Sequence, residues 1–288
     1  MMAISKKMMN AQALAKNEHL FRCPICSLTM EFKEDARLVC EKNHSFDLSR
    51  QGYVNLAPQA HVTKYDKRLF EARKTIITNG FFDPLLERLT ALVDERVQNK
   101  QAPTIIDAGS GEGSHLASIV SKLSDATTGV GIDLAKEGVL AAAKDYPGHI
   151  WLVADLANCP FQDDTFDVML NILSPANYAE FTRVLKPAGM FVKVVPENDY
   201  LKQLRTIFYD DAERQNEGNP VERTGEYFNT VKTERITYDF PLNQMLLEKL
   251  IQMTPLSWGA SEDKIKSALQ SEIPAVTVDY TIIIGTNE

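Results

Sequence analysis

Three of the chain's four cysteines crowd into a short segment near its start, together with a histidine. The spacing is Cys23-x2-Cys26-x13-Cys40-x3-His44. Three thiolates and one imidazole fill the four corners of a tetrahedral Zn²⁺ site, a composition typical of a structural rather than a catalytic centre. We therefore expect one structural zinc ion per chain on these four side chains. The remaining cysteine, Cys159, is expected to be an inert buried thiol.

A second group of residues has the pattern of a nucleotide-type loop. Residues 107–113 read Asp-Ala-Gly-Ser-Gly-Glu-Gly, and they follow an apolar run and precede a helical one. A dinucleotide site would place its third glycine where Ser114 stands. The pattern Asp-x-Gly-x-Gly-x-Gly is instead that of proteins that bind S-adenosylmethionine (AdoMet). The contacts expected from this loop are Asp107, Gly109, Gly111, Glu112 and Gly113, although Glu112 also fits a solvated loop acid.

Acids close the next two apolar runs as well. Asp133 ends the second run, at the place where a carboxylate accepts hydrogen bonds from a ribose diol. Asp155 and Leu156 follow the third run, where adenine lies in folds of this kind. Three acid-terminated strands in register favour AdoMet over a nicotinamide dinucleotide or a ligand-free fold.

A fourth apolar run ends in Asn171-Ile-Leu-Ser174-Pro175. In methyltransferases of this architecture the loop at this place faces the methyl group and its acceptor, so Asn171 and Ser174 are candidates for the substrate pocket. Asn171 resembles the start of the Asn-Pro-Pro-Tyr motif used on exocyclic amines, but the following residues depart from it. A plain strand-to-helix turn capped by Ser174 is the alternative. No catalytic base can be named.

These residues need a scaffold, and residues 103–288 predict one. Short β-branched runs alternate with 10–12-residue helical patterns, which predicts an α/β fold with a parallel, doubly wound sheet. Its ligand crevice lies at the carboxyl ends of the strands. We expect strands at 104–108, 129–133, 150–154, 166–171, 190–195, 231–240 and 276–284. Helices are expected at 114–124, 136–145, 176–185 and 242–252, with an irregular stretch over 214–225.

The segments before position 103 differ from this body. Residues 1–19 are polar and are expected to be a flexible tail, residues 20–58 a zinc-binding head, and residues 59–102 a helical connector broken at Asn79-Gly80. The head is too small for a self-sufficient core, so a metal would supply folding energy. The body forms a Rossmann-like class I AdoMet-dependent methyltransferase domain in this interpretation.

Charge is divided unevenly along the 288 residues. The net charge is −8, which argues against a simple basic nucleic-acid coat protein. Residues 1–100 carry 16 basic and 12 acidic side chains (+4), whereas residues 101–288 carry 15 and 27 (−12). A basic stretch at 61–74 adjoins the head and is a candidate for phosphate contacts, or else an ordinary charged helix face. No apolar run approaches a membrane span and the start lacks a secretory pattern, so we expect a cytoplasmic protein without a membrane partner.

Taken together, these motifs resemble the bacterial 23S rRNA (guanine-N1)-methyltransferases, the RlmA/RrmA family. The resemblance runs from about Phe21 to Trp258. It is carried by the zinc motif, the glycine loop, Gly52-Tyr-Val-Asn-Leu56, Ala72-Arg73, Gly80-Phe-Phe-Asp-Pro-Leu85, Arg183-Val-Leu-Lys-Pro187 and Gln252-Met-Thr-Pro255.

The resemblance implies an AdoMet-dependent methyltransferase that acts on N1 of a guanine in a 23S rRNA hairpin, with a zinc head that helps to recognise the RNA. It also implies cofactor contacts at Phe82, Gly111, Glu112 and Tyr200. Phe82 stands where tyrosine is usual, and Tyr200 where one branch has histidine. Phe81, Phe82 and Tyr200 are candidate stacking walls or core residues.

Three alternatives stay open at this point. One is an AdoMet-dependent enzyme that methylates another RNA. A second is one that methylates a small molecule, which would need neither the head nor the basic stretch. The third is a zinc-headed RNA-binding protein with an inactive methyltransferase body. A homodimer is also left open.

Overall fold

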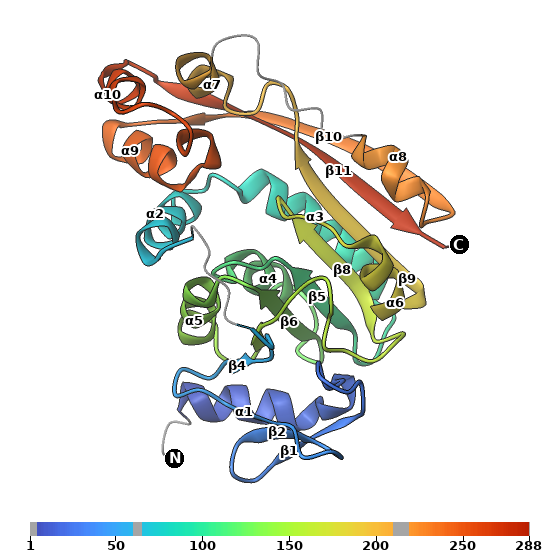
Figure 1. Ribbon diagram of the computed structural model, residues 1–288. Helices are drawn as coiled ribbons and strands as arrows, with labels where there is room; N and C mark the ends of the chain where they lie inside the picture. Colours follow the sequence, from blue (N-terminus) through green and yellow to red (C-terminus); the bar gives the residue numbers. More distant parts are fainter. Residues whose placement is uncertain (1–4, 60–64, 210–218, 288) are drawn as a thin grey trace.

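The computed structural model describes residues 5–59, 65–209 and 219–287. Within them, a mixed eight-stranded sheet has the order β10-β11-β9-β8-β5-β6-β7-β4, and a three-stranded sheet has the order β1-β2-β3. Figure 1 shows the small sheet and α1 at one end of the molecule, and α7, α9 and α10 at the opposite end.

The centre of the large sheet confirms the predicted parallel arrangement. Its parallel strands are β4 (Val54–Asn55), β7 (Ile150–Val153), β6 (Thr128–Asp133), β5 (Thr104–Ala108), β8 (Phe166–Ile172) and β9 (Leu185–Pro196). β5 and β8 are buried along their whole length because helices cover both faces, which is why they read as continuous apolar runs. The two late strands, β11 (Ala275–Thr286) and β10 (Thr230–Pro241), complete the sheet in antiparallel orientation.

The chain reverses its direction of strand addition between β5 and β8. From β5 it builds outward through β6 and β7, and then returns to add β8 and β9 on the other side. This switch point creates a crevice at the carboxyl ends of the two strands, where α/β proteins of this kind bind ligands.

Helices confirm the predicted alternation, with some boundaries shifted by a few residues. They are α2 (Lys67–Thr78), α3 (Asp83–Val97), α4 (Ser114–Val120), α5 (Lys136–Asp145), α6 (Tyr178–Val184), α7 (Lys202–Phe208), α8 (Pro220–Gly225), α9 (Gln244–Met253) and α10 (Glu262–Gln270). The irregular stretch expected over 214–225 is wrong for α8, since Asn219 caps the helix and Pro220 opens it. Residues 214–218 lie outside the described residues.

The expectation of a flexible tail over residues 1–19 is wrong from residue 6 onward. Helix α1 (Lys6–Lys16) begins at the capping side chain of Ser5 and is followed by the 3₁₀ turn η1 (Glu18–Leu20). Asn10 is buried in α1, and its side-chain amide donates to the carbonyls of Gly52 (3.0 Å) and Ala143 (3.3 Å) and accepts from the N–H of Gly148 (2.8 Å). Tertiary contacts therefore hold this helix.

The head is continuous with the body. Its own sheet comprises β1 (Met30–Lys33), β2 (Arg37–Cys40) and β3 (Ser45–Asp47), but β4 joins the large sheet beside β7. Backbone hydrogen bonds also connect Arg22 N–H to the carbonyl of Pro160 (3.0 Å) and Gln162 N–H to that of Leu20 (2.9 Å). The boundaries 20–58, 59–102 and 103–288 remain a predicted division.

No helix within the described ranges is long and apolar enough to cross a membrane.

Replacing Asn10 with alanine tests the role assigned to α1. The variant would leave the Gly148 N–H and two buried carbonyls without a partner, and we expect it to lower the free energy of unfolding by roughly 1–3 kcal/mol in urea denaturation. The matched control is Gln12→Ala on the exposed face of the same helix, where the change should stay within about 0.5 kcal/mol. Equal effects of the two variants would contradict this role.

Candidate functional site

The predicted zinc ligands lie together in the head. The ligand atoms of Cys23, Cys26, Cys40 and His44 are all within 4.8 Å of one another. Nδ1 of His44 is 3.5 Å from Sγ of Cys23 and from Sγ of Cys40, and the Sγ atoms of Cys26 and Cys40 are 3.7 Å apart. A tetrahedron with usual zinc–ligand bond lengths has edges of about 3.8 Å between sulfurs and about 3.5 Å from sulfur to nitrogen. The donor set and its spacing thus fit one Zn²⁺ ion.

Two tight turns create this arrangement. Ser27 and Asn43 both have positive φ angles, 59° and 62°, which bend the chain just after Cys26 and just before His44. Ser27 N–H donates to the carbonyl of Cys23 (2.9 Å), and Cys40 N–H donates to the carbonyl of His44 (3.0 Å). The hairpin of β1 and β2 then brings the second turn back to the first.

The glycine loop follows β5 at the switch point. Gly109, Gly111 and Gly113 have φ angles of 89°, 54° and 81°, a region that side chains disfavour. A Cβ on Gly109 would lie 1.9 Å from Oγ of Ser174, and one on Gly113 would lie 2.4 Å from the ring of Trp151. The loop therefore needs glycine for both conformation and space.

Asp133 fixes the shape of this loop. One carboxylate oxygen accepts from the N–H of Gly111 (2.8 Å), and the other accepts from that of Ala135 (2.7 Å). Burial raises the pKa of Asp133, while these two backbone hydrogen bonds lower it. The structure thus gives Asp133 a positioning role, and its predicted contact to a ribose stays a prediction.

Asp107 is the most perturbed acid at the loop. It is 1% exposed, and burial raises its pKa to about 7, with the nearby Arg73 opposing the rise. Its Oδ1, like Oγ of Ser110, is buried and has no hydrogen-bond partner among the described residues. Such groups cost free energy unless a ligand pairs with them.

Glu112 is a buried ion-pair partner rather than a solvated loop acid. It is 4% exposed, the hydroxyl of Ser114 donates to one of its oxygens, and Nε of Arg73 lies 3.1 Å from the other. The Arg73 guanidinium also lies 5.8 Å from the ring centre of Phe82, within cation–π range. The Arg73 side chain, which extends from α2, is therefore engaged with the glycine loop and does not form part of a free basic surface.

Only some of the other cations of the basic stretch 61–74 are available for phosphate contacts. Lys67 pairs with Glu71 (3.5 Å) and Lys74 with Asp145 (2.6 Å), whereas Arg68 is exposed. Lys64 lies outside the described residues. The prediction of a phosphate-binding face on α2 is thereby reduced to a few of its cations.

The aromatic candidates are mostly core. Phe81 and Phe82 are 0% and 1% exposed and pack edge-on at 4.8 Å between ring centres; Phe82 also meets His115 at 4.6 Å. Neither presents a free face for stacking. Tyr200 is half-buried and packs on Tyr280 at 5.0 Å.

Asn171 is hydrogen-bonded within its own loop, and its predicted role as a pocket donor stays a prediction. It is fully buried, its amide donates to the carbonyls of Ala108 (2.8 Å) and Pro175 (3.0 Å), and its Oδ1 accepts from Nζ of Lys193 (2.6 Å). Lys193 also donates to the carbonyl of Ser174 (2.9 Å). Ser174 is half-buried against Gly109, and the cap of α6 is Asn177 rather than Ser174.

Sequence reasoning missed Lys193, although a lysine within the apolar run 190–195 was a usable signal. Asp155 and Leu156 lie half-buried after β7, where the Asp155 side chain accepts from the N–H of Ala157 (2.9 Å). Cys159 is fully buried and burial raises its pKa to about 12, in agreement with an inert thiol.

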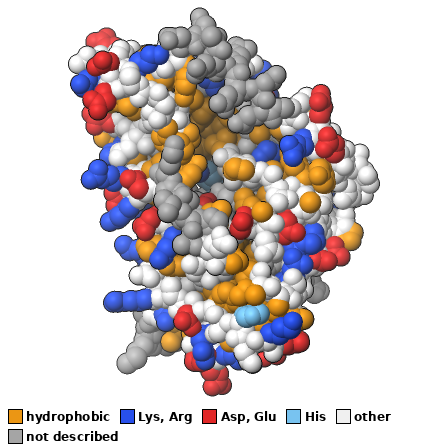
Figure 2. Space-filling view, viewed as in Figure 1, with side chains coloured by type: hydrophobic (Ala, Val, Ile, Leu, Met, Phe, Trp, Pro, Cys, Tyr) orange, Lys and Arg blue, Asp and Glu red, His pale blue; other side chains and the backbone are white. Residues whose placement is uncertain are grey.

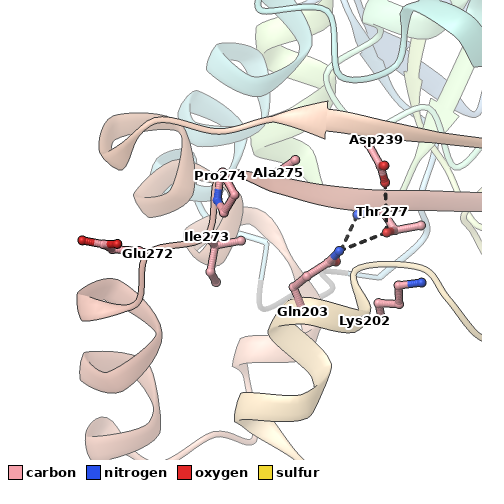
Figure 3. Close-up of a pocket in the computed structure, with 8 residues that line it drawn as sticks. All are labelled: Lys202, Gln203, Asp239, Glu272, Ile273, Pro274, Ala275 and Thr277. Carbon is pink, nitrogen blue, oxygen red and sulfur yellow. Dashed lines mark hydrogen bonds between the residues drawn. The ribbon is translucent and has the colours of Figure 1, made fainter.

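The remaining hollows of the surface differ in character. Figure 2 shows a hollow lined with hydrophobic side chains in the upper half of one face. A separate cavity of about 490 Å³ lies between α7, β10 and β11 and contains none of the predicted site residues. There Gln203 exchanges hydrogen bonds with Thr277, which donates to Asp239 (Figure 3). These polar groups are already hydrogen-bonded to one another. We therefore interpret the cavity as a gap between packed elements and not as a binding site.

Metal analysis tests the zinc centre. The purified protein should contain about one zinc ion per chain, and Cys26→Ser should lose it because three ligands hold the ion far less tightly. Cys159→Ser is the matched control, since it removes the one cysteine outside the cluster, and it should keep the metal. A folded wild-type protein without zinc would contradict the assignment.

The elevated pKa of Asp107 predicts that the stability of the ligand-free protein falls as the pH rises. An unfolded aspartate loses its proton near pH 4, whereas folded Asp107 keeps it up to about pH 7. Raising the pH through this window therefore favours unfolding. We expect ligand-free Asp107→Asn to be more stable than wild type at pH 8, by roughly 1–3 kcal/mol, and to lose that advantage at pH 4. Thermal unfolding at both pH values measures the difference, with exposed Asp125→Asn as control; a pH-independent difference would contradict the burial argument.

Comparisons with known proteins agree with both sites. A family model described as "RlmA, N-terminal" matches residues 21–63, and one described as "Methyltransferase domain" matches residues 105–189. The YcgJ protein of Bacillus subtilis, a solved structure, is 15% identical and covers 70% of this chain and 99% of its own, with a TM-score of 0.46. That likeness is too low to bear on function.

Two curated relatives extend over nearly the whole chain. YxjB of Bacillus subtilis (strain 168), which its name assigns provisionally to the 23S rRNA (guanine-N(1)-)-methyltransferases, is 42% identical over 92% of this chain and 96% of its own length. The 23S rRNA (guanine(748)-N(1))-methyltransferase of Streptomyces fradiae is 31% identical over 88% of this chain and 91% of its own. Together with the zinc cluster and the glycine loop, these matches show that the chain belongs to the family of 23S rRNA (guanine-N1)-methyltransferases with an RlmA-type zinc head.

Proposed function

We propose that this protein transfers a methyl group from AdoMet to N1 of a guanine in a hairpin loop of 23S rRNA. The observation that carries the proposal is the joining of an RlmA-type zinc head to a methyltransferase body in one chain that aligns along almost the whole length of such enzymes. The fully formed glycine loop supports an active body over an inactive one.

The loop fits the methionine half of AdoMet. Oδ1 of Asp107 and Oγ of Ser110 are buried acceptors without a protein partner in the described part of the chain. An ammonium group is the complement that a buried carboxylate requires. AdoMet, when bound, supplies an activated methyl group on a sulfonium. The residues proposed to hold it are Phe82, Asp107, Gly109, Gly111, Glu112, Gly113, Asp133, Asp155, Leu156 and Tyr200.

Not all of these residues act by direct contact. Phe82 is enclosed by Phe81 and His115, so it supports the pocket from behind unless the side chains rearrange on binding. Glu112 is paired with Arg73 and Ser114, which keeps the loop from collapsing onto its neighbours. Asp133 retains lone pairs on both oxygens, so it can accept from a ribose hydroxyl while it holds the loop.

The chemistry asks mainly for positioning. AdoMet held by these residues would supply the methyl group to N1 of guanine, with S-adenosylhomocysteine as the leaving group and the N1 proton passing to a base or to water. The Asn171–Lys193 pair keeps the loop after β8 in place beside the glycine loop. The base that accepts the proton is not assigned.

The RNA is proposed to approach from the side of the head. Unpaired loop bases are the usual targets of sequence-specific RNA recognition, and an enzyme that modifies a base edge must take that base out of its stack. The head docks directly on the segment after β7, so RNA bound there lies beside the crevice. We place the reaction in the cytoplasm, and the homodimer stays a prediction.

Transfer of label tests the proposal. Zinc-loaded protein incubated with labelled AdoMet and an unmodified in vitro transcript of 23S rRNA should place label on the RNA, and mass spectrometry of nuclease fragments should locate 1-methylguanosine at one position. A transcript with that guanine changed to adenine is the control and should stay unlabelled. Label on small molecules but not on RNA, or on another atom of guanine, would contradict the proposal.

A further inference from the structure

Two exposed aromatic side chains meet beside the glycine loop. Tyr65, which precedes α2, is 39% exposed, and Trp258, which follows the 3₁₀ turn η2 (Pro255–Ser257), is 40% exposed. Their rings pack edge to face with centres 5.2 Å apart. Segments almost 200 residues apart in the sequence thus bring two large rings to one place on the surface.

A continuous stack connects this pair to the cofactor loop. Tyr65 packs on Phe70 with ring centres 6.3 Å apart, and Phe70 is 5% exposed. The Phe70 ring contacts the loop at Gly111, where a Cβ would lie 3.4 Å from it, and packs closely on α5, where a Cβ on Gly138 would lie 2.7 Å from it. Burial raises the pKa of the Tyr65 phenol, and the nearby charge of Asp133 raises it further.

Exposed charged side chains of both signs lie near the pair, among them two cations and the acids Asp66 and Glu137. Arg68 on α2 and Lys136 at the first position of α5 are both exposed, and neither has an ion-pair partner within residues 5–59, 65–209 and 219–287. α5 packs against α2, and the Phe70 ring lies against Gly138 of α5, so Arg68 and Lys136 belong to the two helices next to the aromatic pair. An apolar protein partner or a membrane would call for a broad hydrophobic patch, whereas two rings beside two cations match a base and its phosphates.

We propose that Tyr65 and Trp258 form a stacking platform for an unpaired base of the RNA substrate next to the guanine that is methylated. Arg68 and Lys136 then contact the adjoining phosphates. The platform would hold the loop of the hairpin at the rim, so that the target base can enter the crevice. This inference rests on the proposed function and assigns RNA-binding residues to it.

Steady-state kinetics with the 23S rRNA transcript test the platform. Each base stacked on an aromatic ring contributes enough affinity that Tyr65→Ala and Trp258→Ala should each raise the KM for RNA roughly 5- to 100-fold. The kcat and the calorimetric Kd for S-adenosylhomocysteine should stay within about twofold of wild type. Trp258→Phe, which keeps a ring, should restore most of the affinity for RNA.

Tyr227→Ala is the matched control, because Tyr227 is also 40% exposed but packs on Tyr178, next to α8. It should leave the KM for RNA unchanged. An equal rise in this variant would show a general loss of stability and would overturn the platform.

Fluorescence gives a readout independent of activity. The chain has two tryptophans, and the other, Trp151, is 1% exposed. With S-adenosylhomocysteine saturating, addition of the transcript should quench tryptophan emission excited at long wavelength in the wild type and not in Trp258→Phe. Equal quenching in both proteins would overturn the platform.

The other outcomes are also decisive. An unchanged KM for RNA in both alanine variants overturns the platform while leaving the proposed function intact. A loss of affinity for S-adenosylhomocysteine in Tyr65→Ala would mean that the ring covers the cofactor instead. A wild type that methylates no RNA contradicts the proposed function itself, and the fluorescence titration then still decides whether the platform binds RNA.

Discussion

Asp133 helps to hold the glycine loop in shape, because its carboxylate accepts hydrogen bonds from the N–H groups of Gly111 and Ala135. Three residues of the loop have positive φ angles, and at Gly109 and Gly113 neighbouring side chains also fill the space in which a Cβ would lie. The residues around the loop pack closely against it. Trp151 closes the loop from one side, Ser174 from another, and α2 places Arg73 against Glu112 on a third. The result is a rigid cradle whose remaining unpaired acceptors face a ligand with donors.

Charge takes on a different meaning once the contacts are known. The excess of basic residues in the first hundred suggested a positively charged landing surface, but several of these cations are used internally. Arg73 pairs with Glu112, and Lys74 with Asp145. Few cations, such as Arg68, remain for contacts with RNA phosphates. The affinity for RNA must therefore come from shape and base stacking as well as from phosphate contacts. A protein with a net charge of −8 can bind RNA in this way without a broad basic face.

Sequence was a good guide where burial alone decides the structure. β5 and α5 begin and end at the predicted residues, because parallel strands and the helices that cover them carry continuous or periodic apolar patterns. The zinc ligands were predictable because spacing restricts which side chains can meet. α1 was missed because only Asn10, a polar residue, and Leu14 are buried in it, and β4 because two residues carry no pattern. The partners of Asn171 and Arg73, which are Lys193 and Glu112, could not be predicted, since sequence shows a group's chemistry but not its partners.

Binding of S-adenosylhomocysteine to an Asp133 variant tests the central claim most directly, because the claim is that this carboxylate holds the cofactor loop. The account predicts that Asp133→Asn binds S-adenosylhomocysteine at least tenfold more weakly than wild type in calorimetry, since one backbone N–H of the loop loses its acceptor and each lost charged hydrogen bond contributes about 1.5–3 kcal/mol. The exposed Asp125→Asn should bind like wild type. Equal affinities for wild type and Asp133→Asn would contradict the account.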